Sequence, residues 1–509
     1  MLLDWKEEKN VNKYIIKEKS IKKNDMFTNR CSLSPFSYRK VKFNNNNIKK
    51  LEELLKNKRK GFEPGSDVYT KFGDNYFIRI TDLSTTNYTF INTEDTVKLS
   101  YDGIKNKNNV IKNGDICFQT ASDVGNVCIY NGENAYYNSH IIKLDLEESL
   151  KYYIFSILKS KFGTAQVDVG GSIKGVDNFN DELLLNINIP FPNYQDDKEN
   201  ENIVKYISNI TQNIINKEEL IRKKNINIDK AIENELKNNQ KNNKFIYRYP
   251  TKETFINFGR IDASIYERKV KEIEFKIKNY KNGYVHMSEL FNYSRGQNLQ
   301  VSQIGESIYS NIEKNNFYRM FTNIEMQDDR TISGFRWLGN KNKLTILPDN
   351  AVMLAADGLI VGRSFFYDRM ENTITNLHPW IITPKDTSMP IYERVFLSVY
   401  LSYLKNIGYL NRIKDKSNGG GLKKNHLDKW IIIPKFSNET KKKIASEYYN
   451  KLDKNKNLSL DNYLDKEILR NTQLGIYQLN MELISLKNKL EKIIDNLVLG
   501  KPINIDFNY

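Results

Sequence analysis

The amino-acid sequence predicts an α+β fold made of two related modules of mixed helix and strand, each followed by a long amphipathic helix. Its 509 residues exceed a single ordinary core, since domains usually contain about 100–200 residues. Segments of similar pattern recur in the same order in both halves, about 240 residues apart. In each half the last matched segment precedes apolar residues at heptad spacing, which is typical of paired helices.

The first matched segments are short β-rich runs and the hairpins that follow them. Residues 76–83, Tyr-Phe-Ile-Arg-Ile-Thr-Asp-Leu, correspond to residues 318–325, Tyr-Arg-Met-Phe-Thr-Asn-Ile-Glu. Residues 112–127 then correspond to residues 347–363, and both have the order turn, strand, glycine-containing tight turn, strand. We therefore expect the same strand arrangement in both modules.

Four further pairs of segments continue this order without exception. They are an Asn-x-His segment, a helix, a glycine loop and a strand that ends in proline: residues 138–142 with 376–380, 150–162 with 392–407, 170–174 with 417–423, and 187–190 with 430–434. Chance does not produce six matches in one order, so the chain is predicted to be an internal duplication.

A long helix is predicted after each module, and its apolar residues form a narrow seam. The seam residues are Ile207, Ile214, Ile221 and Ile228 in the first helix, and Leu479, Leu483, Leu486, Leu490, Ile493 and Leu497 in the second. Such a seam favours a partner helix over a broad core, so we expect the helices to pair as an antiparallel coiled coil. The alternative is that each helix packs on its own module. A helix of about 35 residues spans roughly 50 Å.

Composition limits the class of partner. The formal charge is +16, from 78 Lys and Arg against 62 Asp and Glu, which favours a polyanion, with nucleic acid ahead of an anionic membrane surface. A general bias toward Lys and Asn would give the same charge and is the alternative. The three cysteines make no disulfide framework or zinc-site pattern, and no apolar run could span a bilayer. We expect a reduced, cytoplasmic protein that does not enter the membrane.

The order of these motifs resembles a known family. The Gly114-Asp115-Ile116 turn, Asn138-Ser139-His140, the Gly170-Gly171-Ser172 loop and the Ile-Pro-Phe-Pro string at 189–192 look like a target recognition domain. The alternation of domain and helix is similar to the specificity (S) subunit of type I restriction-modification systems. Arg260-Ile261-Asp262-Ala263 with Tyr266 resembles an entry into such a domain. The likeness extends from about Ser34 to Leu499.

The sequence departs from this pattern at three places. The second glycine loop has three glycines in a row, the helical region after about Asn438 is longer than its counterpart, and Met1 to Asn29 match nothing in the pattern. The resemblance implies the following division of the chain: residues 1–33, an unassigned charged segment; 34–193, target recognition domain 1; 194–245, a central spacer helix; 246–436, target recognition domain 2; 437–499, C-terminal spacer helices; and 500–509, a tail.

The resemblance also implies a function. Each domain would read one half of a split, asymmetric target in double-stranded DNA, and the helices would set the gap between the two halves. Two adenine-methyltransferase subunits and a restriction or translocase subunit would be the partners, with S-adenosylmethionine bound by the methyltransferase. Two alternatives remain open: a partner that fuses methyltransferase and nuclease, as in type IIB-like systems, and a coiled-coil scaffold that binds membrane or RNA without sequence preference.

No reactive constellation is visible in the sequence. A base-flipping methyltransferase needs a (D/N/S)PP(Y/F) tetrad, and the nearest string, residues 189–192, lacks its polar first residue. The glycines do not have the spacing of a phosphate-binding loop. Glu274-Phe275-Lys276 after Asp262 fits a nuclease only loosely. His140 and His378 occupy matched positions in different modules, which argues against a shared metal. We expect no catalytic residue, metal or cofactor in this chain.

Loops between strands are the usual location of side chains that read DNA bases. In the first half the candidates are Arg79, Thr81, Asp82, Ser122, Asp123, His140, Ser172 and Lys174. In the second half they are Arg319, Asn323, Asp357, Arg363, His378, Ser417, Asn418, Lys423 and Lys424. For Arg79 and Arg319 a buried structural ion pair is an equal alternative, and the turn glycines are expected to serve positive φ angles.

Overall fold

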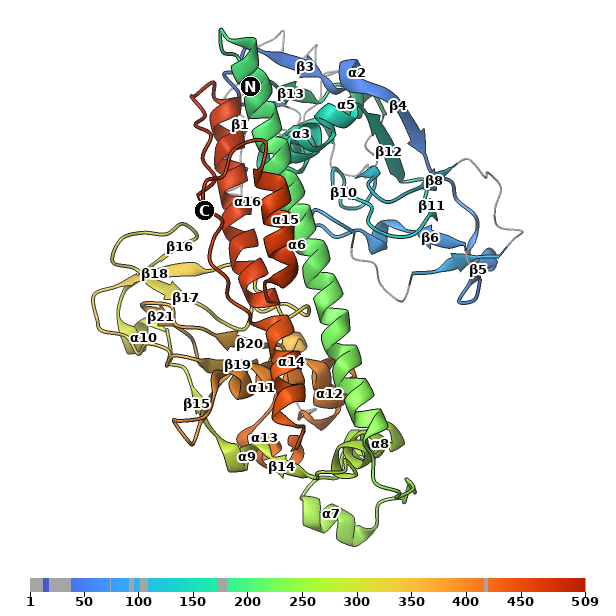
Figure 1. Ribbon diagram of the computed structural model, residues 1–509, viewed down its shortest axis with the longest axis vertical. Coiled ribbons are helices and arrows are strands. Elements are labelled where there is room, and N and C mark those ends of the chain that lie inside the picture. Colours follow the sequence, from blue (N-terminus) through green and yellow to red (C-terminus); the bar gives the residue numbers. More distant parts are fainter. Residues whose placement is uncertain are drawn as a thin grey trace. The chain divides into compact units, whose positions relative to one another are not determined.

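The computed structural model describes residues 12–17, 38–73, 75–90, 96–100, 109–171, 181–415 and 420–508 (Figure 1). The chain divides into two units. Unit 1 contains Met1–Glu219, Lys454–Thr472 and Ser485–Tyr509, and unit 2 contains Leu220–Asp453 and Gln473–Ile484. Among the described residues, no helix is both long and apolar enough to cross a membrane.

Unit 1 contains two principal sheets. One has the strand order β10 (Val127–Ile129), β9 (Ile116–Gln119), β12 (Ile141–Leu146), β4 (Leu55–Lys60), and all its pairs are antiparallel. The other has the order β5 (Tyr69–Thr70), β7 (Lys98–Leu99), β6 (Tyr76–Ile78), β11 (Ala135–Tyr137), β8 (Val110–Ile111). In this second sheet β6 and β11 are parallel. Two further pairs are β1 (Ile15–Lys17) with β2 (Arg39–Val41), and β3 (Ile48–Lys50) with β13 (Asn188–Pro190).

Unit 1 also contains short helices. They are α2 (Leu51–Leu54), α3 (Glu148–Lys159), α4 (Lys161–Gly171) and α5 (Asp181–Leu185), with short 3-10 turns η2 (Ser66–Val68) and η3 (Ile80–Asp82). A core of buried side chains from both principal sheets includes Ile78, Ile111, Cys117, Tyr137 and Ile141. The apolar side chains of these short strands therefore meet in one core, as burial of apolar area requires.

Unit 2 repeats this arrangement. One sheet has the order β20 (Ser364–Tyr367), β19 (Ala351–Ala355), β22 (Pro379–Pro384), β15 (Phe291–Arg295). A second has the order β16 (Ser307–Ser310), β18 (Arg336–Asn340), β17 (Tyr318–Met320), β21 (Thr373–Ile374), with β17 and β21 parallel. The remaining pair is β14 (Tyr284–His286) with β23 (Ile432–Pro434). Unit 2 also contains the helices α7 (Lys252–Phe258), α8 (Arg268–Lys278), α9 (Met287–Leu290), α10 (Val301–Ile304), α11 (Ile391–Asn406), α12 (Tyr409–Ile413), α13 (Lys424–Trp430) and α14 (Asn438–Tyr448), with 3-10 turns η5 (Ala263–Tyr266) and η6 (Gly358–Ile360).

The predicted duplication is confirmed by strand pairing. The order β10-β9-β12-β4 corresponds to β20-β19-β22-β15, the parallel pair β6/β11 corresponds to β17/β21, and β3/β13 corresponds to β14/β23. These pairings join residues far apart in the sequence, so they test the repeat independently of the similar strings. The α+β fold class is likewise confirmed.

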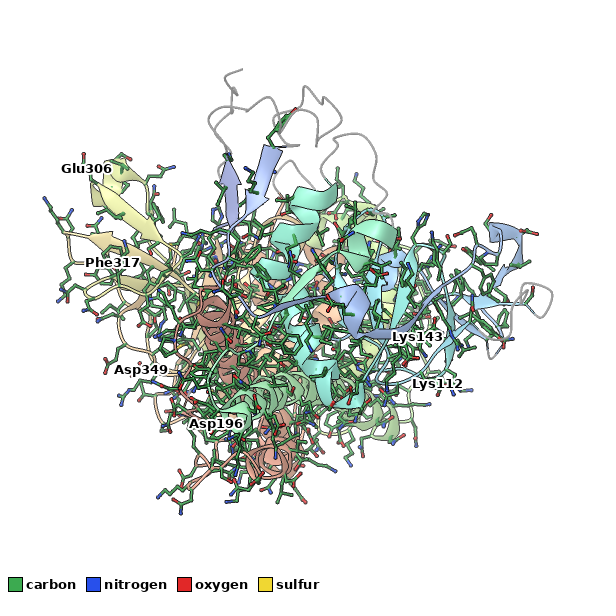
Figure 2. The ribbon with its side chains drawn as sticks, turned by 90° about the horizontal axis from the view of Figure 1, so that it is seen from above. Lys112, Lys143, Asp196, Glu306, Phe317 and Asp349 are labelled. Atoms are coloured by element: carbon green, nitrogen blue, oxygen red, sulfur yellow. The ribbon has the colours of Figure 1, made fainter. Side chains whose placement is uncertain are left out.

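Equivalent turns precede β9 and β19, and each uses a residue that tolerates positive φ. Gly114 has φ +90° and Asn350 has φ +57°. Such angles favour glycine and, after it, asparagine. Asp115 closes the first turn by accepting from the backbone N–H of Lys112 at 2.7 Å, and it pairs with Lys143 Nζ at 2.5 Å; both lysines are labelled in Figure 2. This turn is structural, in agreement with the expectation for the turn glycines.

The spacer helices are α6 (Asp197–Asn238), α15 (Tyr463–Gln473) and α16 (Ile476–Val498). In unit 1, α6 runs antiparallel to α16 (Figure 1). Glu218, near the end of the part of α6 in unit 1, forms an ion pair with Lys487. At the opposite end, the N–H of Ile503, just after α16, donates to the hydroxyl of Tyr194, just before α6. All the predicted seam residues are at most 7% exposed. The predicted antiparallel pair of helices is confirmed, and α15 lies beside it as a third helix that the seam pattern did not predict.

Buried polar side chains interrupt the apolar contact between α6 and α15. Asn213, Lys217 and Asn471 are each 0% exposed. Asn471 donates to Asn213 at 2.8 Å and accepts from Lys217 Nζ at 2.6 Å, and Asn213 donates to Tyr463 at 2.7 Å. Because buried polar groups are costly unless they are satisfied, these bonds fix the register in which the two helices pack.

Replacing Asn471 tests this network. We expect Asn471→Leu to lower the free energy of unfolding by about 2–4 kcal/mol, because it removes an acceptor from a buried ammonium group and a donor to Asn213. Urea unfolding followed by circular dichroism measures the change. The control is Asn488→Leu at an exposed position of α16. A loss no larger than that of the control would contradict the assigned role.

Two glycines that the sequence did not single out bring backbones into close contact. A Cβ on Gly61, just after β4, would lie 2.2 Å from the carbonyl oxygens of Tyr137 and Asn138. A Cβ on Gly296, just after β15, would lie 2.2 Å from the carbonyl oxygen of Asn376. Both positions therefore need glycine, since no real Cβ approaches a backbone atom so closely. The contacts hold the two sheets of each unit against each other.

Substitution of Gly296 tests the close approach. We expect Gly296→Ala to destabilise unit 2 by about 1–3 kcal/mol, because the added methyl group forces the backbone of residues 375–376 to shift. Thermal unfolding monitored by circular dichroism measures the effect. The control Ser294→Ala changes an exposed side chain of β15 and should stay within about 0.5 kcal/mol of the parent. Equal stability of both variants would refute the argument.

Candidate nucleic-acid interface

In unit 1 the candidate residues gather where the parallel strands β6 and β11 end. The carboxyl ends of parallel neighbours emerge at the same edge of a sheet. Residues 79–82 follow β6 and residues 138–140 follow β11, and the N–H of Asn138 donates to the carbonyl of Ile78 at 2.9 Å. The fold thus brings the predicted Arg79, Thr81 and His140 to one edge.

Arg79 and Asp82 form an ion pair at this edge. Asp82 accepts from the backbone N–H of Arg79 at 2.8 Å, from its Nε at 3.3 Å and from its Nη2 at 3.0 Å. The hydrogen bonds to Asp82 raise the pKa of Arg79. The Asp82 side chain is 7% exposed and that of Arg79 is 34% exposed, so the carboxylate is engaged inside while the guanidinium still reaches the surface. This geometry favours the structural ion pair that was the alternative for Arg79, and Thr81 is exposed beside the pair.

The turn between β9 and β10 joins the same edge. Ser122 and Asp123 are exposed, and Ser122 has φ +63°. The backbone N–H and the hydroxyl of Thr120 both donate to the carbonyl of His140, at 2.8 and 3.0 Å. Gly125, with φ +83°, packs so closely on Val167 of α4 that a Cβ would lie 2.7 Å from its side chain. The turn is therefore held between His140 and α4.

The first glycine loop requires a correction. Gly170 and Gly171, predicted to lie in a loop, are the last residues of α4, because the helix continues through them. Ser172 and Lys174 lie outside the described residues, as do Ser417 and Asn418 in the second glycine loop. Their proposed contacts with DNA stay predictions.

In unit 2, three polar side chains converge on one another. His378 Nδ1 lies 3.3 Å from an oxygen of Asp357, and Arg295 Nη1 lies 3.8 Å from the same oxygen. The Arg295 guanidinium also lies 3.8 Å above the ring of Trp380 and donates to the carbonyl of Leu377. Partial burial lowers the pKa of Arg295. The predicted Asp357 and His378 are therefore neighbours. Arg295 was missed, because only the pairing of β15 with β22 places it there.

The described part of the second glycine loop adds lysines to this cluster. The N–H of Leu422 donates to the carbonyl of Ala356 at 2.8 Å, and Trp380 Nε1 donates to the carbonyl of Leu422 at 2.7 Å. The loop thus lies directly beside Asp357. Lys423, whose side chain is 65% exposed, pairs with Asp415 at 2.6 Å, and Lys424 is exposed at the start of α13. The cluster therefore presents cations next to hydrogen-bonding side chains.

Three predicted residues of unit 2 lie elsewhere. Arg363 donates to both oxygens of Asp328 and to the carbonyl of Met326, so its guanidinium holds the turn together. The Arg319 guanidinium stacks 4.9 Å from the ring of Phe335. Asn323 is only 6% exposed, which corrects the expectation that its side chain faces a ligand. The sequence could not reveal the burial of Asn323, because the same polar residue types occur in exposed loops and at buried positions.

An exposed basic strand was not predicted as part of the interface. β4 reads Leu-Lys-Asn-Lys-Arg-Lys and carries Lys56, Arg59 and Lys60 as exposed residues. Lysines on an edge strand also prevent unwanted pairing with other strands. The run of positive charge in this strand is visible in the sequence and could have predicted its role, because a positive strip suits contact with phosphates. Among the described residues, no group of three or more His, Cys, Asp or Glu side chains is placed to hold a metal ion.

Comparison with known proteins bears on these surfaces. Residues 44–223 match the family model described as the type I restriction modification DNA specificity domain. No curated protein sequence matches the chain significantly. The S subunit of a type I restriction-modification system from M. genitalium is 15% identical, with a TM-score of 0.46, over 91% of this chain and 99% of that chain.

Two further solved structures are similar to the chain. The HsdS subunit from Thermoanaerobacter tengcongensis is 14% identical, with a TM-score of 0.27, over 89% of this chain and 97% of that chain. A chain from a structure of the assembly and conformational transition of the type I restriction-modification system is also 14% identical. Its TM-score is 0.29, over 91% of this chain and 100% of that chain. The family model therefore identifies a type I restriction modification DNA specificity domain in residues 44–223 of this chain.

Proposed function

We propose that this chain reads a bipartite, asymmetric target in double-stranded DNA, one half-site with each module, and that it directs partner subunits to that target. The observation that carries the proposal is the repeat of strand order. The specificity-domain match covers residues 44–223. The sheets of unit 2 have the same strand order and the same parallel pair as those of unit 1, except that β8 and the pair β1/β2 of unit 1 have no counterpart among the described strands. A second module with this topology supports a second reader in residues 246–436, beside the first in residues 34–193.

Differences between equivalent edges support an asymmetric target. The segment after β11 reads Asn138-Ser139-His140, and its counterpart after β21 reads Asn376-Leu377-His378. His378 contacts Asp357, whereas in unit 1 the carbonyl of His140 accepts from Thr120. Different donors and acceptors at equivalent positions select different base edges in the major groove. The two half-sites should therefore differ in sequence.

The proposal assigns the chemistry to partners. Two adenine-methyltransferase subunits that bind S-adenosylmethionine, and a restriction or translocase subunit, would act where this chain positions them. The spacer helices in residues 194–245 and 437–499 are the proposed platform, since long helices offer a continuous surface to a partner. The family match supports this assignment, and so does the formal charge of +16, which suits a polyanion.

A partner that fuses methyltransferase and nuclease is the second candidate. The observation that favours it is the C-terminal region, where α14, α15 and α16 provide more helix than the single α6 of the first half. Purification of the tagged chain from its own cells separates the two candidates. Separate methyltransferase and motor chains support the first, and one large bifunctional chain supports the second. A scaffold without sequence preference would purify with neither kind of partner.

Mapping of modified bases tests the bipartite proposal directly. Genomic DNA is sequenced by a method that detects methyladenine, from the source cell and from a strain that lacks the gene for this chain. We expect a split motif with a fixed gap and two different halves, absent from the deletion strain and restored by complementation. A continuous short motif, or methylation that survives the deletion, would refute the proposal.

The lysines beside Asp357 give a second prediction. Lys423→Ala combined with Lys424→Ala should weaken binding to duplexes of every sequence, because ammonium groups neutralise phosphates without reading bases. The slope of log affinity against log salt should fall in magnitude by about 1 for each phosphate that is no longer neutralised. Fluorescence anisotropy with a random-sequence duplex at several salt concentrations measures it. Lys443→Ala, exposed on α14, is the control and should keep the parent slope.

A further inference from the structure

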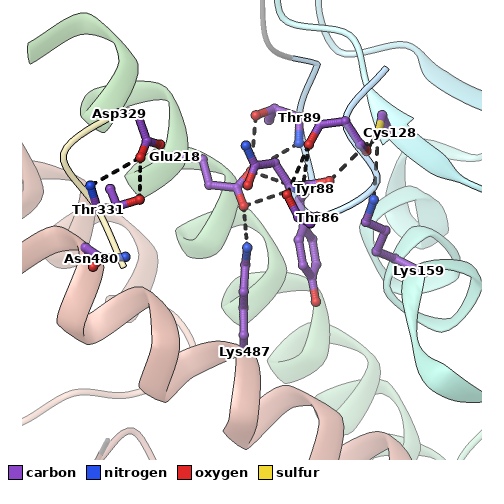
Figure 3. Close-up of polar contacts among 12 residues, drawn as sticks. Thr86, Tyr88, Thr89, Cys128, Lys159, Glu218, Asp329, Thr331, Asn480 and Lys487 are labelled. Carbon is purple, nitrogen blue, oxygen red and sulfur yellow. Dashed lines mark hydrogen bonds and ion pairs between the residues drawn. The ribbon is translucent and has the colours of Figure 1, made fainter. Parts of the chain in front are cut away.

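Glu218, on the spacer helix α6, forms hydrogen bonds with the backbone of a loop in unit 1. This loop, residues 83–90, follows the candidate residues 79–82. Figure 3 shows Glu218 beside Tyr88 and Thr89 of the loop. The carboxylate of Glu218 accepts from the N–H of Tyr88 at 2.9 Å, and from the N–H and hydroxyl of Thr89, both at 3.1 Å. It also pairs with Lys487 Nζ of α16 at 2.6 Å. Glu218 is 8% exposed, so this carboxylate is almost wholly enclosed by its partners.

The same loop is tied to the recognition sheet on its other side. The N–H of Ile129 in β10 donates to the carbonyl of Tyr88 at 2.9 Å, and the N–H of Phe90 donates to the carbonyl of Ile129 at 3.2 Å. The Nζ of Lys487 lies 4.9 Å from the centre of the Tyr88 ring, and the centre of the Phe155 ring in α3 lies 5.7 Å from it. The loop is therefore bonded to β10 of the sheet on one side and in contact with α6 and α16 on the other.

Unit 2 has an equivalent contact built from other residues. Asn480 of α16 accepts from the N–H of Ile332 at 2.9 Å and donates to its carbonyl at 3.1 Å, in the loop that follows β17. Both residues are buried, at 4% and 2% exposure. In the same loop Arg330, 1% exposed, donates to Asn225 at 2.7 Å and forms an ion pair with Asp229, both on α6. This loop is thus also held by α6 and α16.

Polar side chains at these helix positions are not explained by packing alone. The surrounding seam is apolar, and a carboxylate or amide buried in it costs free energy unless its hydrogen bonds are satisfied. Glu218 and Asn480 satisfy theirs mostly with backbone groups. A backbone contact does not depend on the loop's own side chains, so these bonds fix where the loop lies, with the Thr89 hydroxyl as an added side-chain donor in unit 1.

We propose that Glu218 and Asn480 are positioning residues, each of which holds one recognition module in a fixed orientation on the spacer helices. This inference rests on the proposed function, because the orientation matters for reading a half-site. Readout of base edges requires side chains placed to a fraction of an ångström on a rigid support. We call the hydrogen bonds of Glu218, or of Asn480, to its loop a clasp. When a clasp is removed, the module keeps its fold, but the edge that carries its candidate residues becomes mobile, so discrimination at its own half-site falls.

The test compares Glu218→Ala and Asn480→Ala with matched controls. Glu201→Ala on α6 and Asn488→Ala on α16 change exposed residues of the same two helices. Amide hydrogen exchange by mass spectrometry is the readout that does not need DNA. We expect exchange in residues 84–90 to become about tenfold faster or more in Glu218→Ala, and exchange in residues 326–333 to do so in Asn480→Ala, with the other loop unchanged. Unchanged exchange in the clasped loop would overturn the proposal.

The second readout is the map of modified bases. The deletion strain is complemented with each variant, and the two variants should relax the sequence of different half-sites while the other half keeps its specificity. Relaxation of both halves by either variant, or of neither half, would overturn the positioning role. If the parent chain itself restores no methylation, the proposed function fails, and the exchange experiment still decides whether the clasps exist.

A milder variant separates positioning from general instability. Glu218→Gln keeps the size of the side chain and one accepting oxygen, but it removes the charge that pairs with Lys487. We expect exchange in residues 84–90 to lie between the parent and Glu218→Ala, with thermal unfolding close to that of the parent. A variant that unfolds the chain while its loop exchange stays parallel to the whole unit would show a merely structural role and overturn the proposal.

Discussion

The apolar seam of α6 is the constraint on which the rest of the structure depends. A helix of 42 residues with a row of isoleucines cannot bury that row by itself, and it needs other helices to cover it. In unit 1 the cover comes from residues 454–472 and 485–509, more than 200 positions later in the chain. The C-terminal segment therefore completes the core of the unit that begins the sequence. This explains why each unit consists of separate stretches of chain.

Polar residues within the helices give this apolar contact its specificity. Leucine and isoleucine seams tolerate shifts in register, whereas buried amides and charges do not, because a displaced partner leaves a group unsatisfied. The Asn213, Lys217 and Asn471 network serves the pairing of helices, and Glu218 and Asn480 serve the attachment of loops. The helices thus supply buried core and also support the recognition edges.

The recognition edges combine a repeated scaffold with different side chains. Gly61 and Gly296 make the same backbone contact in both units, and the parallel pairs β6/β11 and β17/β21 place the following loops at one edge. The Arg79–Asp82 pair in one unit and the Arg295, Asp357 and His378 cluster in the other then present different donors and acceptors. A duplicated fold with divergent edges is suited to reading two different sequences, and each edge can change without altering the core.

The sequence by itself determined the duplication, the strand segments and the helix seams, because these are local periodicities and repeated strings. It predicted Asp357, His378 and Lys423 as candidate residues of the second half, because their strands and turns could be matched along the chain, and the structure brings these residues close together. Only the tertiary structure decided that Gly170 and Gly171 continue α4, that Asn323 is buried, and that Arg295 joins Asp357. It also decided which backbone groups Glu218 and Asn480 hold. These outcomes depend on contacts between residues far apart in the chain, and a periodic pattern carries no information about which distant partner will satisfy a given polar side chain.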